Sequence, residues 1–113
     1  MSLISFQALD WSAIPKVEYP GKHGTSFAQT MQFEGLRLRI VEYKKGYLAD
    51  HWCEKGHIVH CLQGEFIVEL GKTEKVTFRE DMSFVVSDDL SSHRAFSENG
   101  AKLFIIDGDF LKS

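Results

Sequence analysis

Short apolar segments separated by glycine and polar turns run along almost the whole chain, and they constrain its fold more than any other feature. In FIVEL, for example, Phe66, Val68 and Leu70 fall on one face, because residues two apart on an extended strand point the same way. No stretch keeps the periodicity of an amphipathic helix. The pattern therefore predicts an all-β protein, either a sandwich or a small barrel.

Two features of the strand pattern lead to specific predictions. In the segment LRLRIVEY, Leu36, Leu38 and Ile40 are expected to face the interior, with the two arginines between them facing solvent. A tight turn is expected at Gly64-Glu65, between the apolar runs HIVHCLQ and FIVEL. Both expectations follow from local pattern alone.

The length of 113 residues predicts a single domain spanning residues 1–113. We expect the barrel core at about residues 27–107, with residues 1–26 covering it or pairing with it. A net charge of −3 and the lack of a basic stripe argue against a nucleic-acid partner. No apolar run is long enough to span a membrane, and the N-terminus lacks the features of a signal peptide. A cytoplasmic location with reduced cysteines is therefore expected.

The last apolar segment, residues 101–107, predicts association between copies of the chain. Leu103 and Ile105 share one face of this strand, and Phe104 and Ile106 share the other. A strand that is apolar on both faces needs cover on both sides. We therefore expect a homodimer.

Histidine and cysteine gather in the stretch from Gly46 to Gly64. His51, Cys53 and His57 keep the same parity there, and His93 opens a later strand. Imidazole and thiolate are ligands of zinc, iron, nickel and copper, so the spacing favours a metal site. The alternative is ordinary packing, because cysteine often does no more than fill space in a core.

A cysteine beside a histidine is also compatible with nucleophilic catalysis. Cys53 with His51 or His57 would form a thiolate and imidazolium pair. A set of three histidines around one thiol is more economically a metal shell, so this alternative is the least favoured.

The residues of this stretch resemble the first motif of the cupin superfamily, G-x5-H-x-H-x3,4-E-x6-G. Gly46, His51, Cys53, His57 and Gly64 follow that motif with one residue fewer after the first glycine. The segment from Glu80-Asp81 to His93 is loosely similar to the second motif. The run Asp50-His51-Trp52-Cys53 looks like the small single-domain cupins of the DHCW-motif type.

The resemblance implies a small jelly-roll barrel holding one divalent transition metal by His51, Cys53, His57 and His93. Cys53 stands where the family usually has its second histidine, and His57 where it usually has glutamate. The ligand set would still carry one negative charge, but its thiolate would be a softer ligand than the carboxylate that the family usually has. Zinc or iron is the first expectation, with nickel, copper and manganese as further candidates.

The resemblance also implies a small organic molecule as ligand or substrate, with an oxygenase or isomerase type of reaction. A non-catalytic binding or sensing module is the alternative, and a structural dimer with an empty barrel is a third. Parity makes Glu42 and Tyr47 weak candidates for a catalytic or anchoring role. The expected apolar lining of the pocket is Phe66, Phe78, Met82 and Phe84.

Overall fold

The computed structural model describes residues 4–112, so the ends of the expected domain, at residues 1 and 113, lie outside the described residues. Its elements are the 3-10 turn η1 (Trp11–Ala13), β1 (Val17–Pro20), β2 (Thr25–Phe33), β3 (Leu36–Tyr43), β4 (Tyr47–Leu48), β5 (His57–Leu70), β6 (Glu74–Arg79), β7 (Ser83–Val86), β8 (His93–Ser97), β9 (Ala101–Gly108) and the 3-10 turn η2 (Asp109–Leu111). Among the described residues, no helix is long and apolar enough to cross a membrane.

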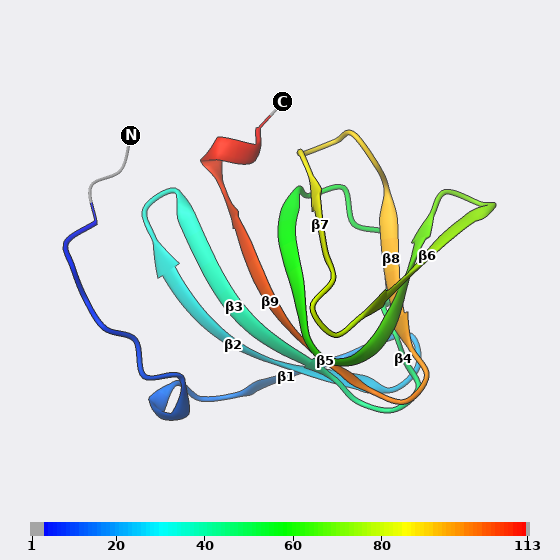
Figure 1. Cartoon of the computed structure of the whole chain (residues 1–113), viewed down its shortest axis with the longest axis horizontal. Helices are drawn as coiled ribbons and strands as arrows, with labels where there is room; N and C mark the ends of the chain where they lie inside the picture. Colours follow the sequence, from blue (N-terminus) through cyan, green and yellow to red (C-terminus); the bar gives the residue numbers. More distant parts are fainter. Residues whose placement is uncertain (1–3, 113) are drawn as a thin grey trace.

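The strands form two sheets that share β5 and curl toward each other (Figure 1). The first sheet has the order β1-β2-β3-β9-β5-β7, and the second has the order β4-β8-β5-β6. All neighbours are antiparallel. The prediction of an all-β jelly roll is confirmed.

Strand β5 runs unbroken through the position where a turn was expected. It has 14 residues and pairs with β7 and β9 in its first half and with β6 and β8 in its second. Its register against β9 shifts between Cys61 and Gln63, and Gly64 has φ of 80°. The expected turn at Gly64-Glu65 was therefore wrong, because the glycine and the bulge bend a continuous strand instead of ending it.

Strand β3 faces the opposite way from the expectation. Val41 is 5% exposed and belongs to the core, and Arg37 and Arg39 share its parity. Leu38 and Ile40 lie on the outer face of the first sheet. The assignment of the arginines to solvent was wrong, because the alternation separates the two faces without showing which one is inside.

The N-terminal segment covers part of that outer face and so explains its apolar residues. The side-chain amide of Gln29, on β2, donates hydrogen bonds to the carbonyl oxygens of Trp11 and Ile14, at 2.6 and 2.9 Å. The ring of Trp11 meets Phe104 of β9 edge-on, with centroids 6.2 Å apart. Phe104, an outward apolar side chain of the first sheet, thus has a packing partner within the chain.

Aromatic rings fill the space between the two sheets. Phe66 and Phe78 stack at 5.3 Å, and Phe78 packs against Phe84 at 5.1 Å. Met82 does not join them, since its backbone closes a turn with Arg79 and its side chain is 37% exposed. The inward placement of Met82 was wrong, because this turn interrupts the parity of the following strand.

We predict that Gly64→Ala lowers the free energy of unfolding by about 2–4 kcal/mol in urea denaturation. A positive φ costs a residue with a Cβ about 1–2 kcal/mol, and here the new Cβ would also collide with the carbonyl oxygen of Gly100. Gly71→Ala is the matched control, because Gly71 has φ of 63° and no atom within 4 Å of the added carbon. An equal loss of unfolding free energy in the two variants would show that the contact between Gly64 and Gly100 does not affect stability.

Candidate metal centre

Cys53 lies in the loop between β4 and β5 and is fixed by its backbone. Its N–H donates to the carbonyl oxygen of His93 at 2.7 Å, and the N–H of His93 donates back to Cys53 at 3.0 Å. His93 is the first residue of β8. This reciprocal bridge places the thiol beside the imidazole, although 40 positions separate the two residues in the sequence.

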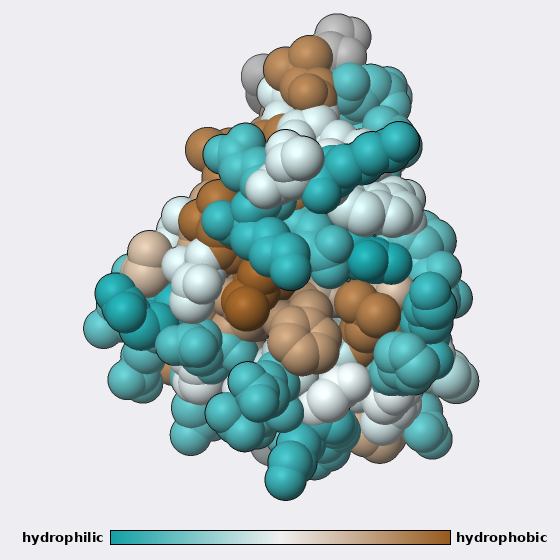
Figure 2. All heavy atoms as spheres, turned by 90° about the vertical axis from the view of Figure 1, so that its right-hand side faces the viewer, coloured by the Kyte–Doolittle hydropathy of each residue, from teal (hydrophilic) through white to brown (hydrophobic). Residues whose placement is uncertain are grey.

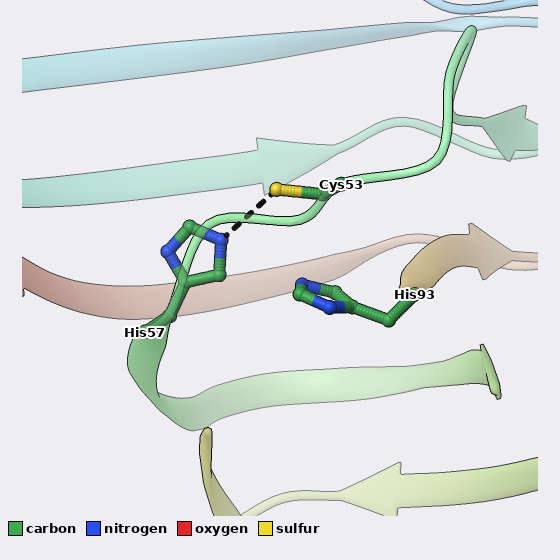
Figure 3. Close-up of side chains that lie close together, drawn as sticks. All are labelled: Cys53, His57 and His93. Atoms are coloured by element: carbon green, nitrogen blue, oxygen red, sulfur yellow. Dashed lines mark hydrogen bonds between the residues drawn. The ribbon is translucent and has the colours of Figure 1, made fainter. Parts of the chain in front are cut away.

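His57, the first residue of β5, completes a cluster of three side chains that point toward one another (Figure 3). The Sγ of Cys53 lies 3.4 Å from the Nε2 of His57. The two imidazole rings of His57 and His93 are nearly perpendicular, with centroids 5.4 Å apart. One ligand atom from each of the three residues lies within 4.8 Å of the others.

Hydrogen bonds behind the two histidines leave their inner nitrogens available as ligands. The Nδ1 of His57 donates to Asp107 Oδ2 at 3.2 Å, and the Nδ1 of His93 donates to the carbonyl oxygen of Ser91 at 3.0 Å. These acceptors require the proton on Nδ1, so Nε2 is the nitrogen that faces Cys53. It donates to the thiolate in metal-free protein, and once it releases that proton it offers a lone pair to a metal. Ligating histidines in metalloproteins are held in the same way.

The surroundings of Cys53 favour its thiolate form. Burial raises the pKa of the thiol, but hydrogen bonds from His57 and His93 outweigh it and lower the pKa to about 5. The hydrogen bond to Cys53 also raises the pKa of His93, against the opposing effect of burial. Because the thiolate is the form that binds metals, the cluster is preorganised for a cation.

The donor set fits a divalent transition metal with an open coordination position. One sulfur and two imidazole nitrogens make three ligands, and three protein ligands plus one exchangeable position are typical of catalytic zinc sites. All three residues line a cavity of about 710 Å³. The open position would therefore face the cavity.

His51 lies outside this cluster. Its side chain is 75% exposed, and its Nδ1 is 2.7 Å from Asp50 Oδ1 at the rim of the cavity. The chain bends at Asp50 and His51 and none of the residues 49–52 is in a strand, so the shared parity of His51 and Cys53 does not bring their side chains together. The structure thus unites three of the four expected ligands.

The expected pocket lining is divided between two cavities. Phe66 lines the large cavity beside the cluster, and Phe78 lines a smaller, apolar one of about 220 Å³ together with Val76 of β6 and Val85 of β7, whereas Phe84 lines both. Figure 2 views the molecule from the side on which β6 lies in Figure 1, and it shows apolar side chains in the middle of this face and toward the upper left, with polar side chains around them.

The two weak catalytic candidates have different positions. Glu42 is on the outer face and forms ion pairs with Lys16 and Lys44 at 3.6 and 3.3 Å. Tyr47 lines the large cavity, where its ring stacks on Tyr43 at 4.6 Å. Burial raises the pKa of both tyrosines, so their hydroxyl groups stay protonated at neutral pH and can donate hydrogen bonds.

Sequence reasoning missed the charged group behind His57. Asp107 accepts two hydrogen bonds from Arg37, at 3.0 and 2.9 Å, and one from Arg39 at 3.1 Å. Burial raises the pKa of Asp107, but the hydrogen bond from Arg37 and the charges of both arginines lower it further than burial raises it. The one available signal was the parity of Arg37 and Arg39 with Val41 and Tyr43 on β3.

We predict that metal-free protein is alkylated by iodoacetamide at Cys53, with a rate that stays high from neutral pH down to about pH 6 and falls near pH 5. This pH dependence follows from the lowered pKa of Cys53, because an ordinary thiol, with a pKa near 8.5, is mostly protonated in this range and reacts slowly. Cys61 is the internal control, since it is 0% exposed and burial raises its pKa. Mass spectrometry of the labelled peptides distinguishes the two, and a rate that rises only above about pH 8 would contradict the lowered pKa.

No protein-family model and no curated protein matches the chain. Solved structures resemble it over most of its length. An ectoine synthase from P. lautus shares 14% identity, with a TM-score of 0.73 over 91% of this chain and 78% of that one. A sugar phosphate isomerase of the cupin superfamily from Silicibacter pomeroyi gives 12% identity and a TM-score of 0.73 over 91% and 76%.

An RmlC-like cupin from Shewanella frigidimarina shares 18% identity, with a TM-score of 0.70 over 92% of this chain and 91% of that one. At such identities the likeness concerns the fold. The resemblance to the DHCW-motif group stays a prediction, as no comparison bears on it. The two curled sheets joined by β5, together with these neighbours, show that the protein has the cupin fold.

Proposed function

We propose that the protein binds one divalent transition metal through Cys53, His57 and His93 and acts on a small organic molecule in the adjoining cavity. The observation that carries this proposal is the convergence of three ligand atoms whose histidines both have Nδ1 bonded elsewhere. The cavity of about 710 Å³ is in the range that small-molecule sites occupy.

The ligands favour zinc or iron, and nickel and copper are the next candidates. A thiolate selects the softer metals over manganese, whose usual ligands are oxygens. When bound, the metal would supply Lewis-acid chemistry at the position that faces the cavity. Both cysteines are free, and a reducing compartment such as the cytoplasm would keep Cys53 available as a ligand.

The chain's own residues would bind and orient the molecule. Phe66 and Phe84 supply apolar walls, and the protonated hydroxyl groups of Tyr43 and Tyr47 supply hydrogen-bond donors. The names of two structural neighbours, a synthase and an isomerase, support an enzymatic role in preference to a non-catalytic binding module. An oxygenase or isomerase reaction stays a prediction.

We predict that elemental analysis finds about one metal ion per chain in the purified protein, and that His57→Ala and His93→Ala each lose most of it. Removing one of three ligands leaves too few to hold the ion against water. His60→Ala is the matched control, because His60 is on the outer face, with its Nδ1 2.6 Å from Ser83 Oγ. Wild-type protein that holds no more metal than the His57→Ala/His93→Ala double variant would refute the proposal.

The same measurement on His51→Ala tests the fourth expected ligand. A site built from three residues keeps its metal in this variant, because the imidazole of His51 points to Asp50 and not to the cluster. Loss of metal in His51→Ala, with the metal content of His60→Ala unchanged, would show that His51 is a fourth ligand.

A second function is favoured by one observation, the line from Cys53 through His57 to Asp107. A thiol, an imidazole and a carboxylate in this order also build a nucleophile, its base and the group that orients the base. The nearby backbone donors argue against it, because the N–H of Cys53 is bonded to His93 and that of Gly56 to Asp88 Oδ1 at 2.6 Å. An activity that survives a chelator and His93→Ala would favour the nucleophile.

The expected homodimer can be measured directly. Half-buried apolar side chains on the outer face of the first sheet are Leu38, Ile40, Phe104 and Ile106. Burial of such side chains against a second copy stabilises a dimer. Light scattering after size exclusion is expected to give twice the chain mass of 12.9 kDa, and a monomer at all concentrations would contradict the prediction.

A further inference from the structure

Two arginines on the wall of the large cavity share a single carboxylate. Arg37 and Arg39 both line the cavity from β3, and both bond to Asp107 of the neighbouring β9. The Oδ2 of Asp107 also accepts the hydrogen bond from His57. One acidic group therefore serves two guanidinium groups and one metal ligand, which leaves one surplus positive charge.

The other charged groups around the cavity have partners of their own. Arg94 is paired with Glu69 at 3.2 Å, and Lys55 with Asp88 at 3.8 Å. The thiolate of Cys53 accepts hydrogen bonds from His57 and His93. Asp50, beside His51, is 60% exposed at the rim, where solvent screens it. The uncompensated charge is therefore concentrated at the arginine pair.

Arg39 also keeps hydrogen-bonding capacity that the protein leaves unused. Its side chain is 22% exposed, and it donates a hydrogen bond to Asp107 through Nη2. Its Nε is buried and has no partner among the described residues. Burial, followed by the charge of Arg37, lowers the pKa of Arg39, as expected for a cation that lacks a full complement of negative charge.

We propose that the Arg37–Arg39 pair binds the carboxylate group of a small organic acid in the cavity beside Cys53, His57 and His93. This inference deepens the proposed function, because it names the ligand class of the same cavity. A guanidinium presents N–H donors in a planar fork that matches a carboxylate. A divalent ion held by one thiolate and two neutral imidazoles would add a further net positive charge and favour the same class.

The position of the pair suits a ligand that reaches the cluster. Arg37 is directly opposite Asp107 in the register of β3 and β9, and β5, which carries His57, is the next strand. The Oδ2 of Asp107 lies 2.9 Å from the Nη2 of Arg37 and 3.2 Å from the Nδ1 of His57, so a single carboxylate separates the arginine from the cluster. A small acid bound at the arginines would therefore lie close to the cluster.

The test is calorimetric titration of metal-free protein with malonate, its uncharged analogue malonamide, and inorganic phosphate. Malonate is expected to bind saturably, and malonamide at least about tenfold more weakly, because the amide cannot compensate the surplus charge. Arg39→Gln is expected to weaken malonate binding about tenfold or more. Added salt should weaken binding to the wild type.

Arg79→Gln is the matched control, because Arg79 is exposed on β6 and does not line the cavity. It should bind malonate like the wild type. Arg39→Lys keeps the positive charge but loses the planar pair of guanidinium donors, so an intermediate affinity for malonate is expected. Circular dichroism checks that each variant is folded, and the comparison of malonate with malonamide needs no variant at all.

Three results would overturn the inference: no saturable binding of malonate at millimolar concentration, equal affinity for malonamide, or equal affinity in folded Arg39→Gln. Phosphate binding tighter than malonate would overturn the carboxylate class. Elemental analysis of the same preparations separates this inference from the metal proposal. Arg39-dependent malonate binding by a chain that takes up no metal would support the anion site and refute the metal site.

Discussion

The cavity depends on one buried carboxylate, that of Asp107. At 2% exposure, this group is stable as an anion because Arg37 and Arg39 surround it with donors, and an unpaired charge in such a place would be costly. It fixes the proton of His57 on Nδ1 and so directs Nε2 toward Cys53. A single side chain at the end of β9 thus sets both the ligand geometry and the charge of the wall.

The cluster itself depends on how the two sheets meet. His57 begins β5 in the first sheet, and His93 begins β8 in the second. Cys53 belongs to neither sheet, but its reciprocal backbone bonds to His93 fix it to the second. The bend at Gly64 allows β5 to serve both sheets. The three residues of the candidate metal site are therefore positioned by the closure of the fold and not by any one strand.

The sequence predicted the strands well because their periodicity is local. It failed where the outcome depended on distant contacts. The alternation in β3 was correctly seen, but the outer face is covered by the segment that contains Trp11 and Ile14, so apolar residues are not restricted to the interior. His51 was grouped with Cys53 by parity, which applies only to extended chain, whereas this loop is bent.

The local pattern gave only an indirect sign of Asp107, the parity of Arg37 and Arg39 with the buried Val41 on the neighbouring strand. Asp107 stands at the end of an apolar strand, where an acidic residue normally marks the return to solvent. Its partners Arg37 and His57 are 70 and 50 positions away. The cluster of Cys53 and His57 was easier to recognise, because the two residues lie close together in the sequence and histidine and cysteine are uncommon. Charge networks that close across strands are visible only once the register of β3, β9 and β5 is known.

The shared oxygen of Asp107 links the proposed anion site to the candidate metal site. Its Oδ2 accepts bonds from Arg37, Arg39 and His57 together, so the three donors compete for the same negative charge. A carboxylate bound at Arg39 would draw this guanidinium away from Oδ2 and strengthen the bond to His57. A stronger acceptor on Nδ1 makes Nε2 a better ligand. By linkage, a cation on Nε2 would favour the acid to the same degree, so the geometry makes the two binding events mutually supportive.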